Sequence, residues 1–364
     1  MIWIDNTIMK NLQVYLPDYR RLIAAAYRRE IPYAPLYEHA VSPKVLSSLV
    51  GRDLESLWEG DRDDKTEAFR TAARILANLG YDAFPFEGCV TELIQGGRGL
   101  MGLGEPIIRD KKDLESFPWA EIPDRYFARF DPYFEALERA LPPGMRAYAG
   151  VGNGLFEIAQ DLVPMTDLAF LELDEPEVFC ELWIKIGDLL LEIWGRFLKR
   201  YDSLFCLYRF GDDLGFKSSL LIKPDTFYRH IAPQYRRLIQ RIKSFGKPFL
   251  LHSCGAIFEI MDELIETCGI DAKHSNEDAI SPFDYWVHTY GDKIALFGGI
   301  DMNILCTEDE QGIRAYVREL VGRIGNQSGI AYGSGNQIAD YVPVEGFLAM
   351  TDELNRLRFT GAGR

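Results

Sequence analysis

The 364-residue sequence lacks a hydrophobic run long enough to cross a membrane. Its most apolar stretch, residues 168–198, is interrupted by acidic residues at helical spacing and falls short of the roughly 18 consecutive apolar residues that a membrane helix needs. The first residues also lack a basic segment followed by an apolar core, which is the pattern of a secretory signal. We therefore expect a soluble chain with no membrane partner.

An excess of positive charge is missing as well. The chain has 40 Lys and Arg against 55 Asp and Glu, so its formal net charge is −15 and its pI is about 4.9. Such a balance repels nucleic acid and anionic lipid, which excludes both as expected partners. A highly anionic substrate would need a local basic pocket to overcome the same field.

A disulfide framework is not indicated either. The six cysteines are spread over more than two hundred residues without regular spacing: Cys89, Cys180, Cys206, Cys254, Cys268 and Cys306. We therefore expect a reduced, cytoplasmic protein.

What the sequence does contain is a repeated unit of a short β-rich apolar run, a glycine-containing or polar turn, and an amphipathic helical segment. This repetition predicts parallel strands joined by helices, and eight such units close a (β/α)8 barrel. The eight predicted strands are residues 31–39, 81–88, 146–154, 203–213, 247–255, 270–276, 293–301 and 329–337.

Helices are predicted between these strands, and further structure before the first one. The clearest helical segments start or end at proline or glycine, at residues 65–80, 224–246 and 256–269. We expect residues 1–30 to form a helical lead-in and residues 31–364 to form one barrel domain. A G-x-G-x-x-G string at Gly97–Gly102 is not followed by a helical pattern, so it indicates a hairpin or loop after the second strand rather than a dinucleotide site.

Polar residues gather at the predicted carboxyl ends of the strands, which converge on one face of a parallel barrel. Most strand-end Asp and Asn residues cap the next helix, so the position alone does not assign a function. The candidates are Glu38, His39, Glu87, Cys89, Asn153, Asp212, Asp213, His252, Cys254, His274, Asn276, Asp301, Asn336 and Gln337.

His252 and Cys254 form the most specific pair among them. Residues i and i+2 of a strand point to the same side, so the imidazole and the thiol share one face and make two of the donors that zinc prefers. A buried histidine beside a small apolar cysteine is the structural alternative. A catalytic zinc needs a third protein donor. By position it is one of Glu87, Cys89, Asp212, Asp213 or Glu277.

Two further sets of carboxyl groups are candidates for catalysis. Of Asp212 and Asp213, one is expected to cap a turn and the other to face the site as a general acid, base or metal ligand. Glu87 stands after Phe86, whose ring would desolvate the carboxylate and raise its pKa toward neutrality. The alternative for Glu87 is a solvated acid at the strand end.

Several segments resemble the uroporphyrinogen decarboxylase superfamily, and the likeness runs from about residue 30 to residue 358. The superfamily has the same barrel fold, and residues 94–119 resemble its β-hairpin after the second strand. The segments that carry the likeness are FLLHSCGAIFEIMDELIETCGIDA (249–272), FGDDLGFKSSLLIKPDTFYRHIAPQYRRLI (210–239), KIALFGGIDMN (293–303) and GSGNQIADYVPVEGFLAM (333–350).

The resemblance implies two activities that can be compared residue by residue. Methyltransferase members act with methylated corrinoid proteins, and they bind zinc through an H-x-C motif, matched by His252 and Cys254, and a later cysteine. Asn336 stands where that cysteine is expected. Either an acid such as Glu87 completes the metal shell, or the metal is weakly held or absent.

Decarboxylase members carry arginines after the first strand to hold the carboxylates of a porphyrinogen. Here that loop reads YEHAVSPKV (37–45) and contains no arginine. A substrate with many carboxylates would be repelled by a chain of this charge, although Glu87 matches the position of the family's catalytic acid. Decarboxylation of uroporphyrinogen is therefore disfavoured.

The sequence thus predicts a zinc-assisted methyltransferase that moves a methyl group between a corrinoid on a partner protein and a small acceptor. The expected zinc ligands are His252, Cys254 and Glu87, the expected catalytic acids are Glu87, Asp212 and Asp213, and Asn153, His274 and Asn336 are expected to contact the cofactor. The alternatives are a cofactor-free decarboxylase or lyase and a non-catalytic barrel that binds a tetrapyrrole or corrinoid. The resemblance also suggests a homodimer.

Overall fold

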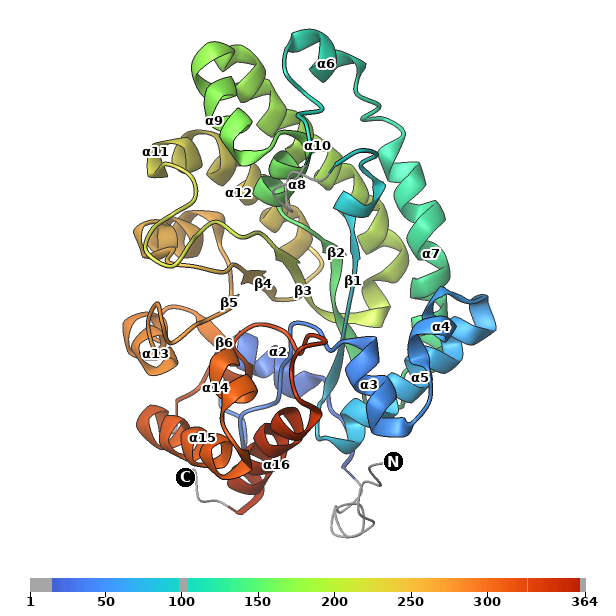
Figure 1. Ribbon diagram of the computed structural model, residues 1–364, viewed down its shortest axis with the longest axis vertical. Helices are drawn as coiled ribbons and strands as arrows, with labels where there is room; N and C mark the ends of the chain where they lie inside the picture. The colour runs from blue at the N-terminus through green and yellow to red at the C-terminus, as the bar shows by residue number, and fades with distance from the viewer. Residues whose placement is uncertain (1–14, 98–103, 326, 361–364) are drawn as a thin grey trace.

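Seven parallel strands curl into a barrel-like sheet with the helices outside it (Figure 1). This is a computed structural model, which describes residues 15–97, 104–325 and 327–360. Each strand pairs with the next one in the chain, so the sheet order follows the sequence. The strands are β1 (Ala83–Cys89), β2 (Arg146–Gly152), β3 (Phe205–Gly211), β4 (Phe249–His252), β5 (Ala272–His274), β6 (Ala295–Ile300) and β7 (Ile330–Ser334). The predicted α/β barrel class is confirmed.

The first predicted strand, residues 31–39, is not a full strand. Leu36 forms only an isolated parallel bridge with Tyr332 of β7. Pro32 and Pro35 lie in this segment, and proline has no N–H to donate to a ladder, which explains the short pairing. Within the part of the chain that the structure describes, the prediction of eight strands is corrected to seven strands and one bridged segment.

Side chains complete the closure between this segment and the sheet. Glu38 is fully buried, and its carboxylate accepts hydrogen bonds from the Ser334 hydroxyl (2.5 Å) and the Tyr81 hydroxyl (2.9 Å). The Tyr148 hydroxyl donates to the Glu38 carbonyl (2.5 Å). Glu38 therefore links the first segment to β2, to β7 and to Tyr81, two residues before the start of β1.

The helices cover the outside of the sheet, and their apolar faces form most of the core. Helix α5 begins at a capping box in which Asp61 and Asp64 bond each other's backbone N–H groups. The helices are α2 (Arg20–Ala26), α3 (Pro43–Val50), α4 (Leu54–Glu59), α5 (Arg62–Asn78), α6 (Lys111–Ser116), α7 (Ile122–Ala140), α8 (Leu155–Leu162), α9 (Met165–Asp174), α10 (Pro176–Tyr201), α11 (Pro224–Thr226), α12 (Ala232–Lys243), α13 (Phe283–Tyr290), α14 (Met302–Thr307), α15 (Glu310–Ile324) and α16 (Val344–Thr360).

Two of the predicted helices differ in detail from the observed ones. The predicted helix at 224–246 is divided into α11, a π-helical turn (Phe227–Ile231) and α12. The segment 256–269 forms a short 3-10 turn (Phe258–Ile260) and a π-helical turn (Glu263–Cys268). No helix of the described residues has the length and apolar character to cross a membrane.

Helix α2 closes one end of the barrel. Its residues Leu22, Ala25 and Ala26 are buried against inward-facing residues of the strands, which form a second small core. The helix lies within the predicted lead-in 1–30, whereas the domain boundary at residue 30 stays a prediction. The strands are parallel, so their polar carboxyl-terminal residues stand together at the end of the sheet opposite to α2.

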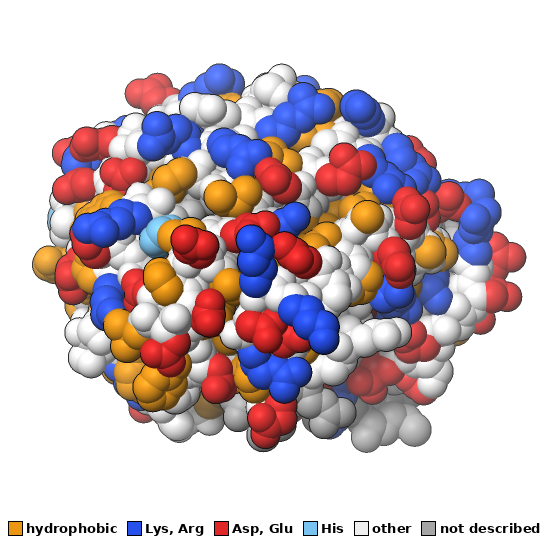
Figure 2. Space-filling view, turned by 90° about the horizontal axis from the view of Figure 1, so that it is seen from above, with side chains coloured by type: hydrophobic (Ala, Val, Ile, Leu, Met, Phe, Trp, Pro, Cys, Tyr) orange, Lys and Arg blue, Asp and Glu red, His pale blue; other side chains and the backbone are white. Residues whose placement is uncertain are grey.

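The predicted hairpin falls partly on residues 98–103, which lie outside the described residues. The described flanks form a 3-10 turn (Val90–Leu93) and helix α6, and they contain no strand. The surface view in Figure 2 shows Lys and Arg side chains interspersed with Asp and Glu on the face seen from above. That face therefore carries no single basic patch of the kind that a polyanion needs.

Candidate metal site at the strand ends

Three potential metal ligands meet at the carboxyl ends of β3 and β4. His252 ends β4, Cys254 follows it by two residues, and Asp213 follows β3. The Cys254 Sγ lies 3.6 Å from the His252 Nε2, and the Asp213 Oδ1 lies 3.9 Å from the same nitrogen. One ligand atom from each residue lies within 4.8 Å of the other two. The pairing of β3 with β4 therefore creates a compact O, N, S donor set.

Hydrogen bonds determine which nitrogen of His252 is free to bind a ligand. The His274 Nε2 lies 3.0 Å from the Ser334 carbonyl oxygen, so this nitrogen carries the proton. Burial lowers the pKa of His274 to about 3, so the ring is neutral and its Nδ1 is an acceptor. The His252 Nδ1, 2.7 Å away, must then be the donor. The His252 Nε2 consequently presents a lone pair toward Cys254 and Asp213, as in the histidine ligands of metal sites.

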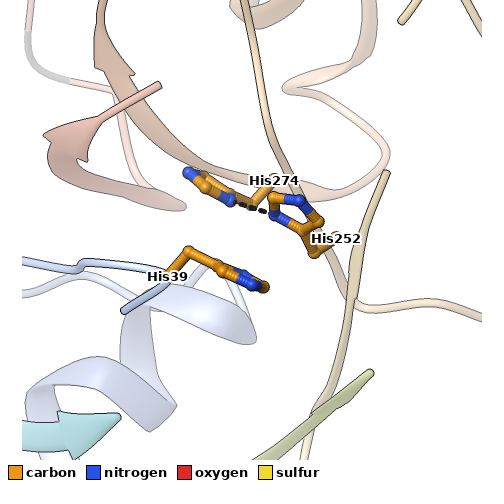
Figure 3. Close-up of side chains that lie close together, drawn as sticks. All are labelled: His39, His252 and His274. Carbon is orange, nitrogen blue, oxygen red and sulfur yellow. Dashed lines mark hydrogen bonds between the residues drawn. The ribbon is translucent and has the colours of Figure 1, made fainter. Parts of the chain in front are cut away.

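His39 stands beside these two histidines, as Figure 3 shows. Its ring centroid lies 3.8 Å from that of His252, and the three imidazoles also bring ligand atoms within 4.8 Å of one another. The His39 Nδ1 accepts from the Arg209 guanidinium at 2.7 Å, and both nitrogens of His274 are already bonded. His252 and His274 are therefore hydrogen-bonded to each other and His39 to Arg209, and a cation among the three rings would face the charge of Arg209.

The donor set of Asp213, His252 and Cys254 fits zinc. In a tetrahedral zinc site with ordinary Zn–N and Zn–S bond lengths, the nitrogen and the sulfur lie about 3.6 Å apart. The His252 Nε2 and the Cys254 Sγ are 3.6 Å apart. Burial raises the pKa of Cys254 to about 12, so a cation is needed to hold it as a thiolate. Three protein donors leave one position for a substrate, which is the pattern of a catalytic zinc.

Asn336 and Ser275 surround the sulfur of Cys254. The Asn336 Nδ2 and the Ser275 Oγ each lie 3.5 Å from the Sγ and donate toward it. The structure therefore brings position 336, which follows β7, to the same sulfur. Asn336 acts there as a hydrogen-bond donor to the sulfur.

Glu87 is not brought to His252 and Cys254. Its carboxylate forms an ion pair with the buried Arg209 at 2.8 Å and lies 3.7 Å from the His39 Nε2. Among the described residues, Glu87 belongs to no group of potential metal ligands. Its strand, β1, is separated from β4 by β2 and β3, and the guanidinium of Arg209, on β3, contacts the Glu87 carboxylate. Asp213 is therefore the acid that the geometry places beside His252 and Cys254.

The two adjacent aspartates at the end of β3 face different partners. Asp212 is buried and accepts hydrogen bonds from the backbone N–H groups of Phe156 (3.0 Å) and Glu157 (2.8 Å) at the start of α8, and from the Tyr235 hydroxyl. Burial raises the pKa of Asp212 to about 6. Asp213 instead accepts from the Cys254 N–H at 2.9 Å. Asp212 thus holds a helix, while Asp213 belongs to the donor set.

Asn153 occupies the turn between β2 and α8. It has a positive φ of 67°, which asparagine tolerates better than most residues. Its Oδ1 accepts from the Thr91 hydroxyl at 3.0 Å, and its Nδ2 donates to the Glu157 carboxylate at 2.8 Å. Asn153 therefore positions Glu157 rather than contacting the metal ligands.

Three residues near the site were not singled out from the sequence. The Glu157 carboxyl has a pKa well above its usual range because it is buried close to Asp212 and Asp213. Lys273 is buried with its ammonium group 4.0 Å from the ring centroid of Trp286, and burial lowers its pKa to about 7. Arg209 was detectable as a lone charge within an apolar strand run, whereas Glu157 lies in the first turn of a helix and gave no such signal.

The fold resembles known enzyme structures at low sequence identity. A methyltransferase from Methanosarcina mazei aligns with a TM-score of 0.73 and 17% identity, over 94% of this chain and 99% of that chain. A protein assigned as a vitamin-B12-independent methionine synthase from Listeria monocytogenes aligns with a TM-score of 0.49 and 14% identity, over 91% of this chain and 99% of that chain. At 17% identity, the likeness to the methyltransferase concerns the fold alone.

Among curated proteins, none matches the sequence. The family model for uroporphyrinogen decarboxylase (URO-D) matches residues 99–357. Because this match covers well over half of the chain, it confirms the resemblance predicted from the sequence, and the chain belongs to the uroporphyrinogen decarboxylase (URO-D) family.

Proposed function

We propose that the chain is a zinc-dependent methyltransferase that moves a methyl group between a corrinoid on a partner protein and a small acceptor. The observation that carries this proposal is the free lone pair of the His252 Nε2, which shares one face with the Cys254 Sγ and the Asp213 Oδ1. The fold likeness to a methyltransferase supports it but does not by itself assign the activity.

Zinc bound at this set would supply a Lewis acid that lowers the pKa of a thiol acceptor and makes it nucleophilic at neutral pH. The chain's own residues prepare the site. His274 fixes the tautomer of His252, and Asn336 and Ser275 donate hydrogen bonds to the sulfur of Cys254. Such donors stabilise a thiolate and tune its strength as a ligand.

Asp213 determines the side from which an acceptor can approach. Its side chain is 42% exposed, whereas that of His252 is 6% exposed. An acceptor would therefore reach the cluster from the Asp213 side, because the His252 side is enclosed by the rings of His39 and His274.

A second candidate is a metal-free lyase, favoured by one observation. The Glu157 carboxyl is buried beside two aspartates, which raises its pKa and suits it to deliver a proton to a carbanion formed by decarboxylation. Asp212, the other buried carboxyl, is already bonded to the start of α8. The two functions differ in their requirement for a metal.

The test uses the full chain loaded with zinc, free methylcobalamin as the donor and a panel of small thiols as acceptors. We expect thiol-dependent loss of the methylcobalamin absorbance, and a fall of at least about 100-fold in the Cys254→Ala variant because a metal ligand is lost. Cys180→Ala is the matched control, since Cys180 is exposed on α10. An unchanged rate in Cys254→Ala would refute the proposal. Metal-independent release of CO₂ from a carboxylic substrate would favour the lyase.

A further inference from the structure

A cavity lies away from the strand-end site. It has a volume of about 420 Å³ and is lined by residues of the segment 30–36, by the start of β7 and the loop before it, and by helices α15 and α16. In Figure 1 these two helices are the orange-red and red helices in the lower part of the view. The cavity is separate from the candidate metal site, because none of Asp213, His252 and Cys254 lines it. A volume of this size accommodates a small organic molecule.

The lining of this cavity combines apolar and polar side chains. Apolar contacts come from Ile31, Leu36 and Val321, among others, and the polar side chains include those of Glu30, Gln327, Ser328, Tyr332 and Arg358. Tyr332 lines the same cavity and is only 7% exposed. Its hydroxyl forms no hydrogen bond with the described residues and is not among the fully buried polar atoms. A ligand in the cavity can therefore form a hydrogen bond with it.

Arg358 is another polar group of this lining. Its Nη2 donates to the Gly80 carbonyl at 2.7 Å, but its Nε and Nη1 have no acceptor among the described residues. No carboxylate of the described residues forms an ion pair with it. The nearby acid Asp82 is paired with Arg21 at 2.8 Å. The Arg358 guanidinium packs against the rings of Tyr33 (5.3 Å) and Phe359 (4.7 Å), so its positive charge is buried largely without an anion.

A buried cation that lacks an anionic partner is destabilising, and an anion in the adjoining cavity would offset the cost. The lining restricts the class of anion. A phosphate is usually held by several donors, often backbone N–H groups at a helix start, whereas one guanidinium and one hydroxyl match a single carboxylate. The surrounding apolar residues match a hydrocarbon body.

We propose that this cavity binds a small amphipathic monocarboxylate, with its carboxylate at Arg358 and Tyr332 and its hydrocarbon part against the apolar lining. The site is independent of the proposed methyl transfer, since it shares no residue with the donor set. The cavity therefore adds a binding function between the start of β7 and helices α15 and α16.

The test is calorimetric titration of the full chain with octanoate, with 1-octanol and octylamine as neutral and cationic analogues. Octanoate is expected to bind, and the two analogues at least about tenfold more weakly, because they lack the charge that Arg358 complements. Arg358→Gln is expected to weaken octanoate about tenfold or more. Tyr332→Phe removes only the hydroxyl and is expected to weaken it about fivefold.

Two further variants separate binding from folding defects. Ala34→Leu fills the cavity from another wall and is expected to abolish binding while the thermal unfolding temperature is retained. Arg356→Gln removes the same charge from α16 outside the cavity lining and is expected to bind octanoate normally. The proposal is overturned if octanoate does not bind, if octanol binds equally well, or if Tyr332→Phe and Ala34→Leu both bind like the unaltered chain.

Discussion

The two ring nitrogens of His252 have different partners. One donates to His274, and the other faces Cys254 and Asp213 with its lone pair. The chain of bonds starts at the Ser334 carbonyl, which fixes the proton on His274. A single backbone oxygen of β7 therefore determines the tautomer of a residue on β4, and through it the ability of the cluster to bind a cation.

His274→Phe tests this orientation. A phenyl ring keeps much of the packing but cannot accept the His252 Nδ1–H, so His252 loses the partner that holds its tautomer. We expect the zinc dissociation constant to rise roughly 10- to 100-fold, measured by competition with a chromophoric chelator. His288→Phe is the control, because His288 is exposed on α13. Equal affinities of the His274→Phe variant and the unaltered chain would contradict the assigned tautomer.

Asn336→Cys tests the contact between position 336 and the sulfur of Cys254. The Asn336 amide nitrogen is 3.5 Å from the sulfur, so a cysteine there would place a fourth donor at the cluster. We expect zinc to dissociate at least about tenfold more slowly in the presence of a chelator, since Cys2His sets with an additional ligand are closed sites. Asn336→Ser is the control of similar size. A rate of zinc loss unchanged by the cysteine would show that position 336 does not reach the metal.

At the scale of elements, the end of β3 gives its two aspartates separate tasks. Successive side chains of an extended segment point to opposite sides, so Asp212 turns toward α8 and Asp213 toward the loop after β4. The carboxylate of Asp212 bonds two N–H groups at the start of α8 and thereby holds the helix that carries Glu157.

This difference gives opposite expectations for two neighbouring variants. Asp212→Ala is expected to lower the free energy of unfolding by about 2–4 kcal/mol, because it removes a helix cap and leaves the Tyr235 hydroxyl unpaired, while zinc is retained. Asp213→Asn is expected to lose zinc with a change in stability below about 1 kcal/mol. Urea unfolding and elemental analysis of both variants provide the measurement. If Asp212→Ala lost zinc at unchanged stability, the roles would be reversed.

Sequence patterns were sufficient to predict seven of the strands, but not the irregular segment 31–39. Periodicity and glycine turns located the seven strands, since a buried parallel strand requires a short apolar run. The pattern failed at residues 31–39, where Pro32 and Pro35 remove donors from an otherwise apolar segment. The H-x-C spacing was sufficient to bring His252 and Cys254 together.

The third ligand could not be chosen in the same way. Glu87 and Asp213 occupy equivalent strand-end positions in the sequence, and only the ion pair of Glu87 with Arg209 distinguishes them. That pair depends on which strands are neighbours and how far each side chain reaches, and neither is encoded in a local pattern. Glu157 was missed for a similar reason, because it reaches the site from a helix rather than from a strand end.

At the scale of the whole molecule, Glu38 connects the two ends of the sheet. Burial raises the pKa of its carboxyl to about 7, although hydrogen bonds from Ser334 and Tyr81 act in the opposite direction. In the unfolded chain the same group titrates near 4.5. Between these two values the folded protein keeps a proton that the unfolded chain has released, so this group makes the fold less stable as the pH rises.

Glu38→Gln tests this contribution. Glutamine keeps the size of the side chain but does not ionise. The variant therefore keeps the free energy of unfolding, about 3 kcal/mol at most, that the unaltered chain loses between pH 4.5 and pH 7. We expect the free energy of unfolding of the variant, relative to the unaltered chain, to rise as the pH increases from 5 to about 8. Glu55→Gln, at an exposed position on α4, should give a difference that is nearly independent of pH. A flat difference for Glu38→Gln would show that the carboxyl titrates normally.

We propose that Asp213, His252 and Cys254 together hold one zinc ion at the carboxyl end of the barrel. X-ray absorption at the zinc edge tests it most directly, on the full chain reconstituted with one equivalent of zinc. We expect one sulfur at about 2.3 Å with nitrogen and oxygen at about 2.0–2.2 Å, and the loss of the sulfur shell in Cys254→Ala. Failure to retain zinc, a shell of nitrogen and oxygen alone, or a sulfur that persists in Cys254→Ala would contradict it.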